Sequence, residues 1–367
     1  MIRYKASTAL VGRCSTFLAR FPVDGQQHCG YNTVAGSIEY QARRASKRFV
    51  HSPQLHPQQR FPAAQWQQIR SNCTAENASA TSASASPIAL PDDLRQRYDE
   101  DGYVIIPDLL SKQQVTSLMD EMEAICRGLR GDIPGVQVTN DSMSRTEVLK
   151  KYLCIHFPHK ISTVIRDLTR ESNTVAVLQK LLGPNIKCMQ TMMFMKASGK
   201  PGQACHQDEF YIPTRDRSLC ASWIALDNVT IENGCVWVIP GSHRPGIIWP
   251  AKQHNDERFD FADASYGYPY SEADFIPVQL PAGSAVFFNG YLLHRSLPNK
   301  SHGFRRAFAN HYMRAESFLP WTNDGRFDIK DDMRDFLLVS GIDPYADFKP
   351  MQSFTKPFLR GETAAAA

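Results

Sequence analysis

The sequence of 367 residues predicts an α+β fold, because helical patterns come first along the chain and short strands follow them. The helical patterns end near Leu182. From Met189 to Tyr312 the apolar runs are short and are separated by Gly, Pro and Asn, which is typical of strands and turns. We expect these strands to form a double-stranded β-helix, the jelly roll of cupins, with the N-terminal helices flanking it.

The helical part contains three expected helices. The first is a short polar helix at residues 92–101. The second opens with a capping box, in which Ser111 is followed three residues later by Gln114. Its Met and aliphatic side chains recur at helical spacing, so we expect them in the core rather than at a cofactor. The third helix covers Thr174–Leu182 and ends at Gly183.

Strands are expected where short apolar runs are bounded by turn residues. The expected strands are Gly102–Pro107, Gln190–Lys196, Ala221–Leu226, Ala285–Phe288, Tyr291–Ser296 and Phe304–Tyr312. Asn289 and Gly290 separate two of these strands, and this dipeptide favours a two-residue hairpin turn because both positions need positive φ. We therefore expect the strand before Asn289 to pair with the strand after Gly290.

The segment His206-Gln207-Asp208 lies among these strands and contains two possible metal ligands. Side chains two residues apart on a strand point to the same face, so His206 and Asp208 can reach one ion. His294, on a later strand, would supply a third ligand, although His294 taken alone could be an ordinary half-buried histidine. Two imidazoles and one carboxylate on one face of a metal leave the opposite face open, as in non-heme Fe(II) oxygenases.

Two other histidines are expected to have no role at a metal. His254-Asn255-Asp256 repeats the same spacing, but it lies in a polar stretch without alternating apolar flanks, so we expect a solvated loop. His243 belongs to the turn at residues 240–246 and is expected to be structural.

The last expected strand carries a cation on its inner face. Alternation places one set of side chains together, namely Arg305, Ala307, Ala309 and His311. An arginine inside a barrel is unfavourable unless an anion meets it, and a guanidinium suits a carboxylate. Arg306 points to the other face and is expected at the surface.

Taken together, these segments resemble the phytanoyl-CoA dioxygenase family of Fe(II)/2-oxoglutarate enzymes over roughly residues 90–319. The matching motifs, in chain order, are Gly183-Pro184-Asn185-Ile186, Thr191-Met192, His206-Gln207-Asp208, Trp223, Glu232-Asn233-Gly234-Cys235, Pro240-Gly241-Ser242-His243, His294-x-Ser296 and Gly303-Phe304-Arg305. Their joint occurrence in this order is specific, although each motif alone is not.

The resemblance implies an oxidoreductase that uses Fe(II), 2-oxoglutarate and O2 to hydroxylate a small molecule, with release of succinate and CO2. It implies that His206, Asp208 and His294 bind the iron and that Arg305 binds the distal carboxylate of 2-oxoglutarate. The other residues that it places at the cosubstrate are Ser296, whose hydroxyl would meet the same carboxylate, and Met192, Gln207 and Trp223. The related halogenases lack the carboxylate ligand, so Asp208 favours hydroxylation.

The family often adds a polar or basic residue from the region before the barrel to its site, and the candidates here are His156, Lys160 and Lys151.

Other functions stay open. A cupin-like metal enzyme that does not use 2-oxoglutarate is disfavoured by Arg305 and Ser296, and a non-catalytic binding module is disfavoured by the complete ligand set. Peptide or protein hydroxylation is not excluded. No basic cluster indicates a site for the phosphates of an acyl-CoA, and the sequence identifies neither the prime substrate nor the oligomeric state.

The expected dioxygenase domain is 91–361, with an insertion at about 247–275. The insertion is rich in aromatic residues, and it could be a lid over the barrel mouth or an excursion packed outside the barrel. Residues 1–90 carry 10 Lys and Arg against 3 Asp and Glu, whereas the remainder carries 31 against 34. The basic charge therefore belongs to the leader, and the domain gives no reason to expect a nucleic-acid partner.

The leader has the composition of a transit peptide followed by a disordered Gln-rich and Ala/Ser-rich linker. We expect a mitochondrial location, with plastid or cytoplasm as alternatives. No apolar run is long enough to span a membrane. The 9 cysteines show no paired metal spacing and are expected to be reduced, and the sequons at Asn72 and Asn77 are expected to be chance matches.

Overall fold

The structure, a computed structural model, describes residues 87–137, 142–317, 336–346 and 357–360. All of them belong to one unit of the chain, Pro62–Ala367. The predicted leader lies outside the described residues except for its last four, and so do Asn72 and Asn77.

The helices mostly precede the strands, as the sequence predicts. They are α3 (Leu94–Asp101), α4 (Lys112–Cys126), α5 (Arg145–Lys150), α6 (Thr163–Leu168), α7 (Ser172–Leu182) and α8 (Asp208–Tyr211), with short 3₁₀ turns η1 (Pro158–Lys160) and η2 (Glu272–Asp274). The capping box of α4 is confirmed, because Ser111 Oγ accepts from the Gln114 amide while Gln114 Oε1 accepts from the Ser111 amide. Helix α7 begins before Thr174 because the Glu171 side chain caps it.

In the described ranges, the strands form two larger antiparallel sheets and one short pair. The large sheet consists, in spatial order, of β1 (Tyr103–Ile106), β10 (Ala285–Asn289), β5 (Cys220–Ala225), β12 (Arg305–Arg314), β3 (Ile186–Lys196), β2 (Cys154–His156) and β14 (Phe358–Leu359), and β13 (Leu337–Ser340) also pairs with β3. The small sheet consists of β4 (Gln203–His206), β11 (His294–Ser296), β6 (Val236–Val238) and β9 (Ile276–Val278). The remaining pair is β7 (Ala251–Lys252) with β8 (Ala264–Ser265). Antiparallel sheets with flanking helices are thus confirmed.

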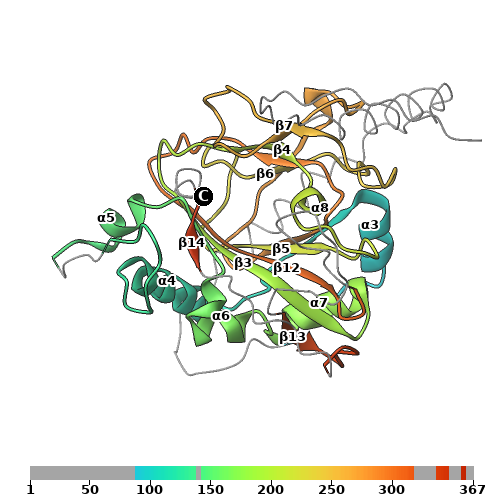
Figure 1. The fold of residues 1–367 in the computed structure, drawn as a ribbon, viewed down its shortest axis with the longest axis horizontal. Coiled ribbons are helices and arrows are strands. Elements are labelled where there is room, and N and C mark those ends of the chain that lie inside the picture. Colours follow the sequence, from blue (N-terminus) through green and yellow to red (C-terminus); the bar gives the residue numbers. More distant parts are fainter. Residues whose placement is uncertain (1–86, 138–141, 318–335, 347–356, 361–367) are drawn as a thin grey trace, which may run out of the picture. The chain divides into compact units, whose positions relative to one another are not determined.

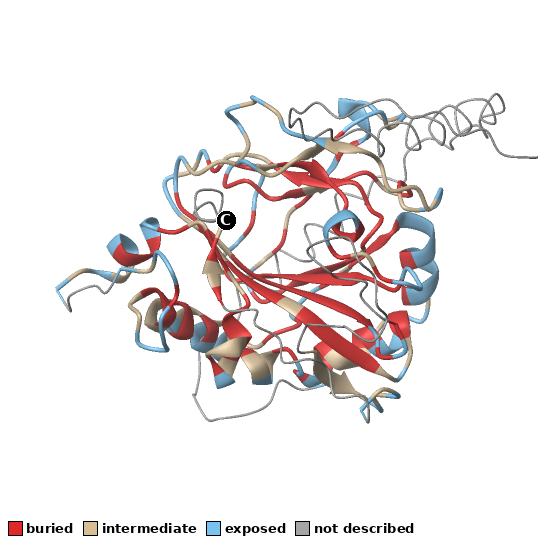
Figure 2. Ribbon diagram, in the orientation of Figure 1, coloured by how far each residue is buried: buried red, intermediate tan, exposed pale blue. Residues whose placement is uncertain are grey.

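The large sheet separates two apolar layers. In Figure 1, helices α4, α6 and α7 lie on one side of β3, β12 and β5, and the small sheet lies on the other side. Alternation along β12 explains both layers: Phe308 and Tyr312 pack with the helices, whereas Ala307 and Ala309 face the small sheet. Figure 2 shows these strands as almost wholly buried, whereas the exposed positions lie on the helices and the loops. The apolar stripe of α4, including Leu118 and Met122, belongs to the helical layer, which confirms its expected role in the core.

The predicted hairpin at Asn289-Gly290 is wrong. β10 pairs with β1 and β5 in the large sheet, whereas β11 pairs with β4 and β6 in the small sheet, so the chain crosses between sheets here. Gly290 does not have positive φ. A Cβ at this position would lie 2.7 Å from Leu219 Cβ, so the glycine permits close packing rather than a hairpin turn.

The cysteines that the structure describes are all free and buried, as expected for reduced thiols: Cys126, Cys154, Cys188, Cys205, Cys220 and Cys235. Burial is the main cause that raises each thiol pKa, to about 12 for Cys154, Cys205 and Cys220. Among the described residues, no helix is both long and apolar enough to cross a membrane.

Candidate metal centre and cosubstrate pocket

A cavity of about 80 Å³ lies between the two sheets, and side chains from both sheets line it. The large sheet contributes Met192, Phe194, Ala221, Trp223, Phe288, Arg305, Ala309 and His311. The small sheet contributes Gln203, His206, Val236, His294, Arg295 and Ser296, and Asp208 and Arg360 complete the lining. Of the inner-face side chains predicted on β12, Arg305, Ala309 and His311 therefore lie where a ligand can reach them, whereas Ala307 belongs to the apolar cluster between the sheets and not to the lining.

The main chain brings His206, Asp208 and His294 together. Strand β4 ends at His206 and Asp208 opens helix α8, so the expectation that both lie on one strand is wrong. Gln207 nevertheless has extended dihedrals, with φ of −123° and ψ of 129°, and the alternation of sides therefore continues through it. His294 lies directly opposite His206 in the pairing of β11 with β4.

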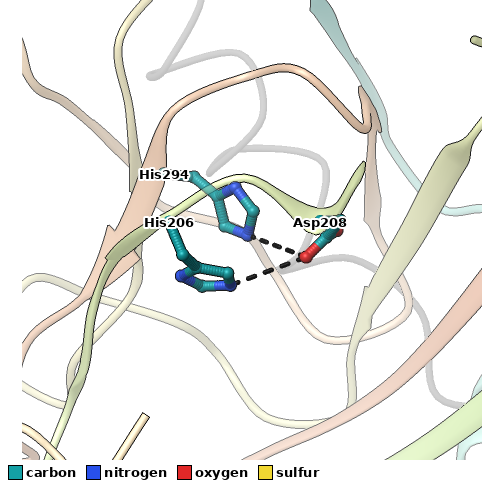
Figure 3. Close-up of side chains that lie close together, drawn as sticks. All are labelled: His206, Asp208 and His294. Atoms are coloured by element: carbon teal, nitrogen blue, oxygen red, sulfur yellow. Dashed lines mark ion pairs between the residues drawn. The ribbon is translucent and has the colours of Figure 1, made fainter. Parts of the chain in front are cut away.

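The three side chains converge on one point, as Figure 3 shows. His206 Nε2 and His294 Nε2 each lie 3.5 Å from Asp208 Oδ1. The possible ligand atoms of the three residues all lie within 4.8 Å of one another, and no other such group of three occurs in the described part of the chain. All three residues are buried.

Both imidazoles are held in the tautomer that a metal needs. Nδ1 of His206 lies 2.8 Å from the carbonyl oxygen of Ala204, and Nδ1 of His294 lies 2.9 Å from that of Leu292. Each Nδ1–H can donate to its carbonyl, which leaves a lone pair on Nε2 facing the shared point. Burial, together with the neighbouring His206, lowers the pKa of His294 to about 4, which keeps this imidazole neutral.

The carboxylate of Asp208 is oriented by a fourth residue, His311 of β12. His311 Nε2 lies 3.1 Å from Asp208 Oδ2, so it can hold one oxygen while Oδ1 faces the two other histidines. Burial acts to raise the pKa of Asp208, but interactions with His294 and His311 outweigh it and hold this pKa well below its usual range. The sequence placed His311 on the correct face of its strand but gave no sign of this contact.

Arg305 is a buried cation that has no ion pair with an acid among the residues that the structure describes. Its exposed fraction is 2%, and its Nε has no hydrogen-bond partner in that part of the chain. The carboxylate that acts on its pKa, Asp227, is already bound by Arg306 at 2.6 Å. Burial lowers the pKa of Arg305 to about 10. The guanidinium carbon lies 5.2 Å from the ring centre of Trp223, so an aromatic wall flanks the place where an anion could bind.

Ser296 lines the same cavity as Arg305 and the metal-facing histidines, and Lys196, which is not part of the lining, contacts its hydroxyl. Lys196 Nζ donates to Ser296 Oγ at 3.0 Å and to the Leu297 carbonyl at 2.8 Å. Sequence reasoning missed Lys196. Its position two residues after Phe194 on an alternating strand could have indicated that it points inwards.

The other predicted cosubstrate residues differ in their positions. Met192 and Trp223 line the cavity, but Gln207 does not. The Gln207 amide donates to the carbonyls of Ile247 and Tyr291 and accepts from the Trp249 amide. Gln207 therefore anchors the start of the predicted insertion.

None of the candidates His156, Lys160 and Lys151 belongs to the described lining of the cavity. His156 instead stacks on Phe358 with a ring separation of 4.4 Å. Strand β14 places Arg360, the residue after it, at the cavity, where Arg360 Nη1 donates to Gln203 Oε1 at 3.2 Å. No sequence motif pointed to Arg360.

The segment 247–275 packs mainly on the outer face of the small sheet. Its aromatic residues Trp249, Tyr268 and Tyr270 contact a cluster that contains Cys205 and Leu293, the outward-facing neighbours of the two metal-facing histidines. The described lining of the cavity contains no residue of this segment. Only Asp260 approaches the cavity, through its ion pair with Arg360 at 2.8 Å. These contacts favour the excursion over the lid.

The remaining assignments can be checked directly. His254 and Asp256 lie in a loop where Asp256 pairs with Arg258, as expected of a solvated stretch. His243 approaches the Asp99 carbonyl oxygen outside the metal-facing group, which fits a structural role. Arg306 is not a free surface arginine, because it is half-buried and ion-paired with Asp227 on the side away from the cavity.

Comparison with known proteins assigns the chain to a family. The sequence profile described as Phytanoyl-CoA dioxygenase (PhyH) matches residues 98–307, which is more than half of the chain. The chain belongs to the phytanoyl-CoA dioxygenase family. This match confirms the predicted membership. At the level of the family, it also confirms the predicted activity, that of a dioxygenase that depends on iron and 2-oxoglutarate and consumes O2.

Members of the phytanoyl-CoA dioxygenase family from distant organisms resemble the chain. A "Phytanoyl-CoA dioxygenase" of Arabidopsis thaliana is 31% identical over 171 residues, which cover 46% of this chain and 59% of that protein. The human "Phytanoyl-CoA dioxygenase, peroxisomal" is 29% identical over 242 residues, covering 60% of this chain and 68% of the human protein. The match therefore spans only about three fifths of the Arabidopsis relative.

Solved structures support the fold of this family member. The apo form of a non-heme monooxygenase named ThoJ superposes with a TM-score of 0.54 at 21% identity, covering 73% of this chain and 88% of that one. The likeness is one of fold and carries no statement about substrate.

Proposed function

We propose that this protein is a non-heme dioxygenase that binds Fe(II) and 2-oxoglutarate, hydroxylates a small-molecule substrate, and releases succinate and CO2. One observation carries the proposal: three converging ligand atoms and the buried guanidinium of Arg305, which pairs with no acid of the described residues, line a single cavity. The first feature suits a ferrous ion, and the second suits the distal carboxylate of an oxo acid.

The residues fit a ferrous ion held by His206, Asp208 and His294. Their donor set is two neutral imidazole nitrogens and one carboxylate oxygen, which suits non-heme iron. The backbone carbonyls of Ala204 and Leu292 orient the imidazoles, and a metal ligand commonly has such a partner on its other nitrogen. His311 orients the carboxylate in the same way.

The residues also fit a dicarboxylate cosubstrate. Arg305 would bind the distal carboxylate through its two-nitrogen fork, and Ser296 would add a hydroxyl to the same group. Met192 and Trp223 would form apolar walls of the pocket. The position of Gln207 does not support the contact that the resemblance implied, because its amide is occupied by the backbone of other segments.

The bound iron and oxo acid would supply the activation of O2, and the chain's own residues would supply position and protection from water. His206 and His294 must stay neutral to act as ligands, and the low pKa of His294 favours this state. Phe194, Trp223 and Phe288 surround the cavity with aromatic surface, which limits the access of water.

Asp208 supports hydroxylation over halogenation, since its carboxylate would occupy the position that halide needs. A cupin-like enzyme without 2-oxoglutarate would have no use for a buried Arg305 lacking an acid. A non-catalytic module would have no use for three converging ligand atoms. These alternatives therefore have no observation in their favour.

The test compares two neighbouring arginines. In an anaerobic titration of the Fe(II)-loaded protein with 2-oxoglutarate, we expect a weak visible charge-transfer band. Arg305→Ala should weaken oxo-acid binding with iron still bound, whereas the matched control Arg306→Ala should leave binding unchanged because Arg306 faces away from the cavity. Asp208→Ala should abolish the band. Succinate release across a metabolite panel then identifies the prime substrate.

The result that contradicts the cosubstrate assignment is equally clear. If Arg305→Ala and Arg306→Ala bind 2-oxoglutarate as the unaltered protein does, the oxo acid does not use this guanidinium. If the unaltered protein shows neither the band nor succinate release, the proposed reaction is wrong.

For the architecture, we propose that the two antiparallel sheets form a double-stranded β-helix in a dioxygenase domain at 91–361. The crossing of the chain from β10 to β11 supports this topology. We also propose that residues 1–90 direct the protein to mitochondria, although the human relative is named as peroxisomal. A fluorescent protein fused behind residues 1–90 should accumulate in mitochondria, and a peroxisomal, plastid or diffuse signal would exclude this address.

A further inference from the structure

A second buried cation, Lys196, lies next to Arg305 but outside the lining of the cavity. Lys196 of β3 lies directly opposite Arg305 of β12 in the sheet register, and each side chain is only 2% exposed. Lys196 pairs with no carboxylate in the described part of the chain. Asp260, the acid that acts most on it, is already bound by Arg360 at 2.8 Å. A lysine is seldom fully buried without an acid, so its position requires an explanation.

The direct contacts of Lys196 are with neutral oxygens. Its Nζ donates to Ser296 Oγ at 3.0 Å and to the Leu297 carbonyl at 2.8 Å. Burial, followed by the nearby Arg305, lowers the pKa of Lys196 well below its usual range. An ammonium has three hydrogens and a neutral amine has two, so both contacts persist in either protonation state.

Ser296 Oγ accepts a second hydrogen bond, from the backbone amide of Gln203 at 3.2 Å. A hydroxyl has two acceptor positions and one donor hydrogen. Lys196 and the Gln203 amide therefore occupy both acceptor positions, and the hydrogen of the hydroxyl must point elsewhere. No described residue accepts it, and Ser296 lines the cavity that contains Arg305.

We propose that Lys196 is a positioning residue, which together with the Gln203 amide turns the Ser296 hydroxyl into an obligatory donor toward the carboxylate held by Arg305. The inference rests on the proposed function, since that carboxylate is the distal group of 2-oxoglutarate. Lys196 itself lies behind the cavity wall and does not touch the cosubstrate.

The proposal predicts what happens when the lysine is removed. Lys196→Met keeps the length and apolar stem of the side chain but leaves the Leu297 carbonyl without its donor. The Ser296 hydroxyl is then free to rotate and to satisfy a neighbouring backbone oxygen. The carboxylate then loses the hydrogen bond from the Ser296 hydroxyl. Because this bond is made to a charged group, its loss should lower the affinity for 2-oxoglutarate about tenfold or more.

The experiment is a double-mutant cycle on the full chain, loaded anaerobically with Fe(II) and titrated by calorimetry. The variants are Lys196→Met, Ser296→Ala and the double variant. The ligands are 2-oxoglutarate and 2-oxopentanoate, which has the same carbon chain but a methyl group in place of the distal carboxylate. Each single variant should weaken 2-oxoglutarate about tenfold or more and leave 2-oxopentanoate within about twofold. The double variant should bind 2-oxoglutarate no more than about twofold worse than Ser296→Ala.

Three results overturn the proposal. The first is an unchanged affinity for 2-oxoglutarate in Ser296→Ala, a small change that leaves the fold intact. The second is an equal loss for both oxo acids in Lys196→Met, which is the mark of a purely structural lysine. The third is a double variant whose loss of 2-oxoglutarate affinity equals the product of the two single losses, because the lysine then acts independently of Ser296.

Two further arms keep the test decisive. If Lys196→Met does not fold, Lys196→Leu, which likewise has no N–H to donate to Ser296 Oγ, takes its place in the cycle with the same criteria. If the unaltered protein itself fails to bind 2-oxoglutarate, the proposed function fails. A failure of the positioning role alone appears instead as normal binding by the unaltered protein with one of the three results above.

Discussion

Glu209 should make the stability of the protein depend on pH. It follows Asp208 in helix α8 and is 3% exposed. Its Oε1 accepts hydrogen bonds from the amide and the hydroxyl of Thr214, each at 2.6 Å, but its Oε2 is buried and has no partner among the described residues. Burial is the main cause that raises the pKa of Glu209 from 4.5 to about 7.

The raised pKa of Glu209 determines the direction and the size of the change in stability with pH. A proton binds more tightly to Glu209 in the folded chain than in the unfolded chain, so the associated stability is complete below pH 4.5 and is lost as the pH rises through about 7. The difference between these two pKa values corresponds to about 3 kcal/mol of the free energy of unfolding. Glu209→Gln keeps the shape but removes the titration.

The assay is urea unfolding of the unaltered chain and of Glu209→Gln, at pH 4.5 and at pH 8, with a chelator present to remove metal. Relative to Glu209→Gln, the unaltered chain should lose about 3 kcal/mol of unfolding free energy between the two pH values. Parallel pH profiles for the two proteins would refute the reasoning, because Glu209 would then titrate alike in the folded and unfolded chains.

Three further substitutions test contacts around the site. His311→Ala should weaken Fe(II) binding by about 10- to 100-fold in competition with a chelator, because Asp208 Oδ2 loses its partner; unchanged affinity would exclude this role. Gln207→Leu should lower the free energy of unfolding by about 2–4 kcal/mol and increase proteolysis within 247–275, with 2-oxoglutarate affinity retained; a selective loss of that affinity would contradict its placement. Gly290→Asn should destabilise the fold by about 1–3 kcal/mol, since its Cβ would approach Leu219, whereas a hairpin turn would accept Asn without loss.

The relation of His206 to Asp208 could be predicted from the sequence because it is local, whereas His294 reaches them only through the pairing of β11 with β4. His206 and Asp208 are separated by one extended residue, so their shared side follows from backbone geometry alone. The alternation that placed Arg305 on an inner face and Arg306 on the outer face has the same origin. These predictions need only the conformation of a few consecutive residues.

The remaining parts of the site depend on strand order, which no local pattern contains. Lys196 meets Ser296 across about a hundred positions of sequence, and His311 meets Asp208 across a similar separation. Arg360 reaches the cavity only because β14 pairs with β2. The error at Gly290 has the same cause, since a dipeptide that suits a hairpin also suits a tight crossing between two sheets.

The burial of the cysteine thiols affects how well the protein resists oxidation. Peroxide and similar by-products of a dioxygenase attack thiolates, and a thiol with a pKa near 12 is ionised at neutral pH in roughly one molecule in 10⁵. Cys205 adjoins His206 in the chain, yet it packs in the aromatic cluster behind the small sheet and does not line the cavity with the candidate ligands. Oxidants formed in turnovers without substrate should therefore modify the histidines and aromatic rings of the cavity before they oxidise these sulfur atoms.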